Sequence, residues 1–153
     1  MGALLAVDAG IRTGLALFDA SGRLVWCRSH NLGSTSRLKK AAARIVFTLP
    51  DLEWLVVEGG GAIAEMWEHT AIKQGVKIRL VQAHEWRGAF LLPRQQHSGA
   101  TAKAVACALA RAFVHAEGPS ISTTLRHDAA EAMLLGLWAV TDLNWRTMPR
   151  LKT

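Results

Sequence analysis

Two short apolar runs that each end in a carboxylate place the strongest constraint on the fold of this chain. Residues 4–7 read Leu-Leu-Ala-Val and precede Asp8, and residues 54–57 read Trp-Leu-Val-Val and precede Glu58. A short apolar run of this kind is typical of a buried strand. We therefore expect a central sheet in which two buried strands each deliver an acid to the sheet edge.

The pattern along the chain predicts an α/β fold built on one mixed sheet of five strands. Strands are expected over residues 4–7, 15–18, 23–28, 54–57 and 77–81, and helices over about residues 34–47, 62–74, 84–91, 101–115 and 126–142. The first three strands follow one another at short spacing, which favours an antiparallel meander. Helical crossovers between the later strands favour parallel pairing. The expected order is β-β-β-α-β-α-β followed by helices.

The length and composition of the chain predict one domain. Its 153 residues are 50% hydrophobic and 20% charged, enough for one core and against wholesale disorder. We expect a domain over residues 1–143 and a basic C-terminal tail over residues 144–153. The apolar stretches are too short or too interrupted to cross a bilayer, and no secretory signal is visible. Cys27 and Cys107 are isolated, so we expect reduced thiols in a cytoplasmic protein, with a disulfide as the alternative.

The formal net charge of +6 suggests a polyanionic partner such as nucleic acid. A solvated basic surface without a partner would give the same composition, so both interpretations stay open at this point.

A second pair of acids, Asp128 and Glu131, opens the last predicted helix. Because residues of an α-helix advance by about 100° each, both acids share a face with Leu135 and Trp138. If that face packs on the sheet, the pair approaches the two acids at the strand ends. A hard divalent cation is the usual compensation for carboxylates brought together beside a core. The alternative for Asp128 is a favourable interaction with the helix dipole alone.

The acids at the strand ends also have simpler interpretations. Asp8 could form an Asx turn before Gly10, and Glu58 could face solvent beside the glycines of residues 59–61. The combined placement of the acids favours a shared site.

These residues resemble the ribonuclease H and retroviral-integrase superfamily, and within it the RuvC-like Holliday junction resolvases. The similarity rests on residues 5–16, 56–58 and 128–132, and it covers most of the chain in element order. It implies a ribonuclease H-like fold and a catalytic four-carboxylate site that holds two Mg²⁺ or Mn²⁺ ions. That site would consist of Asp8, Glu58, Asp128 and Glu131, the last being typically an aspartate in the family.

The resemblance also implies a basic region that holds the scissile phosphate. Arg87 and Lys103 are expected to contact that phosphate or to stabilise its charge, with Lys103 in the catalytic set. Arg94 and Arg111 are expected to follow the DNA backbone. Trp86 is expected either to stack on a base or to lie in the core.

Two further expectations come from the resemblance. Some relatives use a histidine on the last helix, so His127 is a possible metal ligand or proton carrier. In RuvC-like proteins the equivalent of the helix at residues 62–74 supports a two-fold dimer, which predicts a homodimer. Core packing is the alternative for Met66 and Trp67 on that helix.

The implied activity is a metal-dependent, structure-selective endodeoxyribonuclease that resolves four-way DNA junctions by phosphodiester hydrolysis in recombination and repair. Residues 34–49 contain no carboxylate, which disfavours true ribonuclease H enzymes, and residues 8–10 lack the Asp-x-Glu of proofreading exonucleases. A YqgF-like or other nuclease acting on flaps or structured RNA remains an alternative. Arg12 suits YqgF-like nucleases, although their Glu-Arg-x-Thr-Thr motif is missing. A catalytically weak module that binds branched nucleic acid is a further alternative, favoured by Glu131 in place of aspartate.

Overall fold

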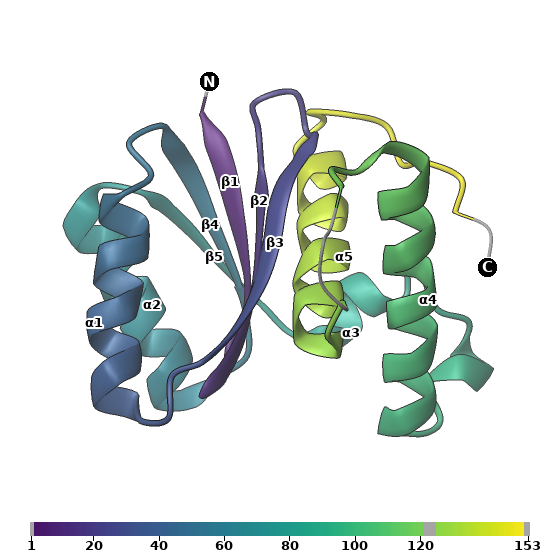
Figure 1. Ribbon diagram of the computed structural model, residues 1–153, viewed down its shortest axis with the longest axis horizontal. Helices are drawn as coiled ribbons and strands as arrows, with labels where there is room; N and C mark the ends of the chain where they lie inside the picture. The colour runs from purple at the N-terminus through teal and green to yellow at the C-terminus, as the bar shows by residue number, and fades with distance from the viewer. Residues whose placement is uncertain (1, 121–124, 152–153) are drawn as a thin grey trace.

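The computed structural model describes residues 2–120 and 125–151, and it has the predicted α/β architecture (Figure 1). The strands are β1 (Ala3–Asp8), β2 (Arg12–Phe18), β3 (Leu24–Asn31), β4 (Leu52–Glu58) and β5 (Lys77–Val81). The helices are α1 (Thr35–Phe47), α2 (Gly61–Gln74), α3 (Ala83–Arg87), the 3-10 helix η1 (Pro93–Gln96), α4 (Gly99–Glu117) and α5 (His127–Asp142).

The predicted element order is confirmed, with differences at the boundaries. The strand β2 begins three residues before its predicted start, so the link after β1 is shorter than expected. The helix α3 ends at Arg87 instead of residue 91, and η1 forms in the segment between the helices predicted over residues 84–91 and 101–115. The segment that connects the helices predicted over residues 101–115 and 126–142 lies partly outside the described residues.

The five strands form one mixed sheet in the order β3-β2-β1-β4-β5. The strand β1 pairs antiparallel with β2 and parallel with β4, and β4 pairs parallel with β5. Parallel pairing places the carboxyl ends of β1, β4 and β5 at the same edge of the sheet. In the register of β1 and β4, Asp8 lies directly opposite Glu58.

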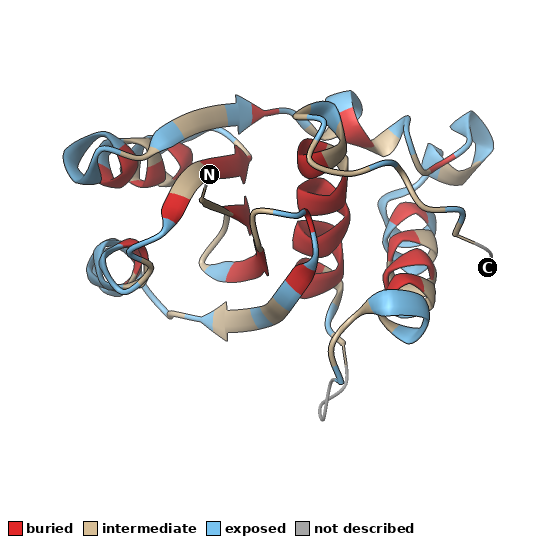
Figure 2. Cartoon of the chain, turned by 90° about the horizontal axis from the view of Figure 1, so that it is seen from above, coloured by how far each residue is buried: buried red, intermediate tan, exposed pale blue. Residues whose placement is uncertain are grey.

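Helices cover both faces of the sheet and create two cores (Figure 1). The helices α1 and α2 pack on one face, where the core includes Leu5, Val7 and Trp67. The helix α5 packs on the other face with α3 and α4 outside it, and its core includes Leu4 and Ala6. Figure 2 shows that α5 is buried along nearly its whole length, whereas α1 and α2 are buried on one side.

Two glycines allow α5 to approach β2 closely. A Cβ atom at Gly14 would overlap the backbone carbonyl of Asp128, and a Cβ atom at Gly136 would overlap the ring of Phe18. These two contacts, one in the first turn of the helix and one near its middle, fix α5 against the sheet. The amino end of α5 is thereby held at the edge where β1 and β4 end.

The described part of the predicted C-terminal tail packs against the domain. Trp145, Met148 and Leu151 contact the core on the α5 side. Arg146 forms an ion pair with Glu117 and donates a hydrogen bond to the carbonyl of Gly22. Residues 144–151 are therefore part of the folded body. Within the described ranges, no helix is both long and apolar enough to cross a membrane.

Candidate active site

The ends of β1 and β4 place two carboxylates side by side. Successive residues of a strand point to opposite faces, so Asp8 lies on the same face as Leu4 and Ala6, which is the face covered by α5. Glu58 lies opposite Asp8 on the neighbouring strand and shares that face. Both predicted acids therefore point toward α5.

The amino end of α5 brings the second pair of carboxylates to the same place. Asp128 is 3% exposed and Glu131 is 5% exposed, so the helix buries both acids. The contact between Gly14 and the Asp128 backbone holds this first turn beside β2, and Gly14 pairs with Asp8 across the sheet. The predicted convergence of all four acids is present.

The electrostatics of Asp8 reflect this convergence. Burial and then the negative charges of Glu131 and Glu58 raise the pKa of Asp8 from 3.8 to about 8, and a hydrogen bond with Glu131 and the charge of Asp128 add to the effect. The pKa of Glu58 is also raised, chiefly by burial, although a hydrogen bond from Trp86 opposes the shift. The four acids are thus close enough to disfavour full ionisation of the set.

Three of the four acids are held by donors from other parts of the protein. The Nε1 atom of Trp86 donates to Glu58 at 3.0 Å. The Nη2 atom of Arg87 donates to Oε1 of Glu131 at 2.7 Å.

The third donor lies on the opposite side of the site. The hydroxyl of Ser29 on β3 donates to Oδ2 of Asp128 at 2.6 Å. No such donor contacts Asp8 within the described residues, where its only side-chain hydrogen bond is the one with Glu131.

The short helix α3 supplies two of these donors. Its first turn is fixed by a capping box, in which the Glu85 carboxylate accepts from the backbone N–H of Gln82 at 2.6 Å. Trp86 and Arg87 follow directly. The ring of Trp86 is 0% exposed, which supports the core interpretation of this residue and leaves no face for base stacking.

The chemistry of the four acids suits a divalent metal ion. Carboxylate oxygens are the ligands that Mg²⁺ and Mn²⁺ prefer, and the excess of buried negative charge calls for a cation. Within residues 2–120 and 125–151, however, no three acidic, histidine or cysteine side chains are arranged to hold an ion. Donors from α3 and β3 contact three of the four carboxylates in this metal-free arrangement.

The predicted basic residues lie on two sides of the acids. Lys103 and Arg111 are exposed on α4 and flank Cys107 at helical spacing of four residues. Burial raises the pKa of the Cys107 thiol, Arg111 opposes that shift, and Glu131 and Asp128 reinforce it. This face of α4 is therefore close to the acids.

Other predicted residues are less closely connected to the acids. Arg94 is exposed on η1, and it makes no ion pair with an acid of the described part of the chain. His127 begins α5 and is half-buried beside Asp128.

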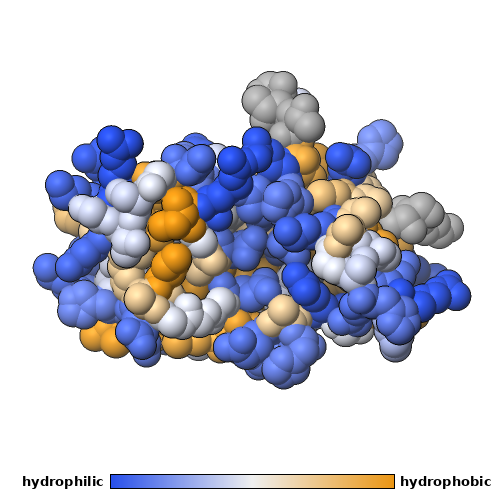
Figure 3. Space-filling model, turned by 90° about the horizontal axis from the view of Figure 1, so that it is seen from below, coloured by the Kyte–Doolittle hydropathy of each residue, from blue (hydrophilic) through white to orange (hydrophobic). Residues whose placement is uncertain are grey.

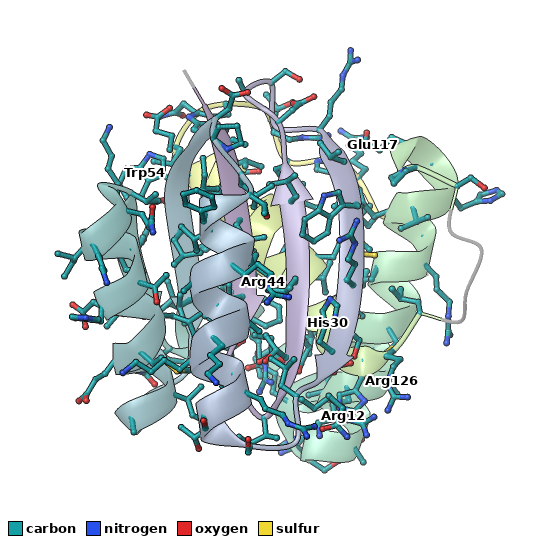
Figure 4. All side chains as sticks on the ribbon, turned by 60° about the vertical axis from the view of Figure 1, so that its left-hand side comes forward. Arg12, His30, Arg44, Trp54, Glu117 and Arg126 are labelled. Atoms are coloured by element: carbon teal, nitrogen blue, oxygen red, sulfur yellow. The ribbon has the colours of Figure 1, made fainter. Side chains whose placement is uncertain are left out.

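Sequence reasoning missed two polar residues next to Asp128. Besides Ser29, Arg126 lies with its Nε atom 4.0 Å from Oδ1 of Asp128. Arg126 and Arg12 lie at the same end of the sheet in Figure 4. The position of Arg126 directly before an acid-bearing helix was the available signal.

In Figure 3, which views the molecule from this end, hydrophilic residues cover most of the surface and apolar residues gather mainly to one side.

Comparison with known proteins identifies the fold. No protein-family model and no curated protein matches the sequence. T. thermophilus RuvC, solved in complex with Holliday junction substrate, is similar with a TM-score of 0.66 and 14% sequence identity, over 99% of this chain and 100% of that chain. An intasome of simian T-cell lymphotropic virus is similar over 99% of this chain and 56% of that chain at 11% identity, but its TM-score of 0.36 is too low to support a conclusion. The chain therefore has the ribonuclease H-like fold of RuvC, which its motifs predicted.

Proposed function

We propose that the protein is a metal-dependent endonuclease that cleaves four-way DNA junctions. The observation that carries this proposal is the convergence of Asp8, Glu58, Asp128 and Glu131 at one edge of a RuvC-like sheet. A structural role for four neighbouring buried carboxylates is unfavourable, because their mutual repulsion costs stability unless a cation compensates it. A site that destabilises the fold is retained where it serves chemistry.

The same four acids would hold the ions. Asp8 lies centrally, since each of the other three acids raises its pKa. Two divalent ions, when bound, would activate a water and stabilise the departing oxygen of the phosphodiester. The raised pKa of Asp8 favours a proton on this carboxyl in the free protein, and that proton would leave when the ligand set forms.

Basic side chains of the chain would bind the DNA around this centre. Arg87 at the edge of the acids and Lys103 on α4 are proposed to neutralise the scissile phosphate, and Arg94 and Arg111 to contact the backbone farther away. We extend this group to Arg126, which sequence reasoning did not include. Trp86 orients Glu58 in this scheme and does not contact a base.

A cleavage assay with Mg²⁺ tests the proposal. The substrates are a four-way junction, a flap, a linear duplex and an RNA–DNA hybrid of equal length. We expect the junction to be cut fastest and Asp8→Asn to reduce the rate by at least about a thousandfold. The matched control is Asp51→Asn, an exposed aspartate at the opposite end of β4, which should leave the rate unchanged. Preference for the flap or the hybrid over the junction would favour the YqgF-like alternative.

The arrangement of the donors favours a second candidate, a module that binds branched DNA with weak or no turnover. Three acids contact protein donors, and the described residues contain no ready metal-holding group. This candidate predicts tight junction binding that weakens steeply with salt, with a log–log slope of about −0.9 per neutralised phosphate, and no cleavage with either Mg²⁺ or Mn²⁺. Many turnovers of junction cleavage by the wild-type protein with either ion would exclude it.

The proposed homodimer also needs a direct measurement. Trp67 is buried in the core of its own chain, whereas Ile72 on α2 and Phe47 on α1 are among the most exposed large apolar side chains. Sedimentation of the wild-type protein should give the mass of two chains. A single-chain mass at micromolar concentration would contradict the dimer.

A further inference from the structure

We propose that Arg87 is a positioning residue that neutralises the Glu131 carboxylate in the free protein and releases it to bind metal when a substrate phosphate takes over its guanidinium. This inference rests on the proposed function, because it assumes that the four acids bind divalent ions. It adds that DNA binding completes the metal site, so that the free protein binds metal weakly and the DNA-bound protein binds it well.

The geometry of the pair supports this role. Nη2 of Arg87 lies 2.7 Å from Oε1 of Glu131, a short charge-assisted hydrogen bond between α3 and α5. The Glu131 side chain is 6% exposed, whereas that of Arg87 is 26% exposed. The carboxylate therefore sits inside the site, and the guanidinium sits at its surface, where a phosphate group can reach it.

The chemistry of the two partners makes the contact exchangeable. A guanidinium carries five N–H donors in a planar fork that matches phosphate as well as carboxylate. Arg87 neutralises the Glu131 carboxylate and occupies its Oε1 atom, so a divalent ion that binds this carboxylate competes with Arg87 for its negative charge. A phosphate that draws Arg87 outward would free Glu131 and bring a negative charge beside the ions.

The other donors around the acids are not equivalent to Arg87. Trp86 and Ser29 are neutral donors, so they leave the negative charge of their carboxylates available to a cation, whereas Arg87 neutralises the charge of Glu131. The Nε atom of Arg126 lies 4.0 Å from Oδ1 of Asp128, which is too distant for a hydrogen bond, and the Arg126 side chain is about half exposed. Among the described residues, Arg87 is thus the cation that donates a hydrogen bond to a buried acid of this site.

The first test measures Mn²⁺ binding in the absence of DNA, from the loss of the free-ion electron paramagnetic resonance signal. The matched control for Arg87→Gln is Arg79→Gln, because Arg79 pairs with Asp142 at the far end of the same helix α5. Arg87→Gln should bind Mn²⁺ more tightly than wild type by roughly 5- to 150-fold, the usual size of a coupling between two sites. Arg79→Gln should stay within about twofold of wild type. Equal or weaker Mn²⁺ binding by Arg87→Gln than by Arg79→Gln would overturn the proposal.

A second variant protects the test from misfolding. Arg87→Lys keeps the positive charge but lacks the planar fork, so its Mn²⁺ affinity should lie between those of wild type and Arg87→Gln. Weaker binding than wild type would contradict competition between the cation and residue 87.

The second test measures the coupling to DNA. Fluorescence anisotropy gives the affinity for a labelled four-way junction in EDTA and in Ca²⁺, and the ratio of the two affinities is the coupling. Wild type and Arg79→Gln should show the same ratio, and Arg87→Gln should show a clearly smaller one. An unchanged ratio in Arg87→Gln overturns the release by phosphate. If wild type binds no junction in either condition, the proposed function fails, and the Mn²⁺ comparison still decides whether Arg87 competes with the ion.

Discussion

Replacing Asp8 with asparagine should stabilise the metal-free protein at neutral pH while it abolishes cleavage. The pKa of Asp8 is raised from 3.8 to about 8, first by burial and then by the charges of the neighbouring acids. Between these two values the folded protein holds a proton that the unfolded chain has released. Since the folded state binds more protons, the free energy of unfolding must fall as the pH rises through this window.

The size of the effect follows from the shift. One pKa unit corresponds to about 1.4 kcal/mol, so the approximately four units at Asp8 correspond to a loss on the order of 4–6 kcal/mol between pH 4 and pH 8. Asparagine does not titrate and has nearly the same shape. Asp8→Asn should therefore match wild type near pH 4 and exceed it by a few kcal/mol near pH 8.

Urea unfolding in EDTA, followed by the fluorescence of the 6 tryptophans, measures this difference at several pH values. The control Asp51→Asn should show no pH-dependent gain. Adding Mn²⁺ should stabilise wild type and leave Asp8→Asn nearly unchanged, because only an intact site binds the ion. The reasoning is refuted if Asp8→Asn is no more stable than wild type at pH 8, or if the difference does not grow with pH.

Three further substitutions test contacts around the site. Gly14→Ala should cost about 3 kcal/mol in urea unfolding, because the added methyl group overlaps the Asp128 backbone, and an unchanged stability would contradict that packing. Trp86→Phe should cost about 1–2 kcal/mol more than Trp67→Phe, since both rings are buried but only Trp86 Nε1 has a hydrogen-bond partner within the described residues; equal costs would show that this bond contributes nothing. Ser29→Ala should lower Mn²⁺ affinity or the cleavage rate by about 10- to 100-fold, and a fully active variant would remove Ser29 from the site.

The sequence predicted the fold because its signals are local. The first and last residues of β5, Lys77 and Val81, are those predicted from the sequence. Ser34 caps α1, as serine often does at the start of a helix. The convergence of the four acids was also predicted. The end of a strand and the face of a helix can be assigned once the type of each element is known, and these assignments place the acids. The resemblance to RuvC then placed these elements in one topology.

The donors around the acids could not be predicted in the same way. Ser29 lies opposite Gly14, but this register depends on a bulge between Leu17 and Phe18 that no residue pattern indicates. The hydrogen bonds of Trp86 and Arg87 depend on the orientation of a five-residue helix, which tertiary packing determines. The contacts that hold the carboxylates therefore became visible only in the structure.

The central claim is that four carboxylates form a divalent metal site, and anomalous diffraction from a crystal soaked in Mn²⁺ tests it most directly. The account predicts anomalous density between Asp8 and the amino end of α5, within ligand distance of Glu58, Asp128 and Glu131, and none in Asp8→Asn crystals. In the protein without DNA, Arg87 donates a hydrogen bond to Glu131. The anomalous density should therefore strengthen when junction DNA is present. Absence of density at this position in both the free and DNA-bound crystals would contradict the claim.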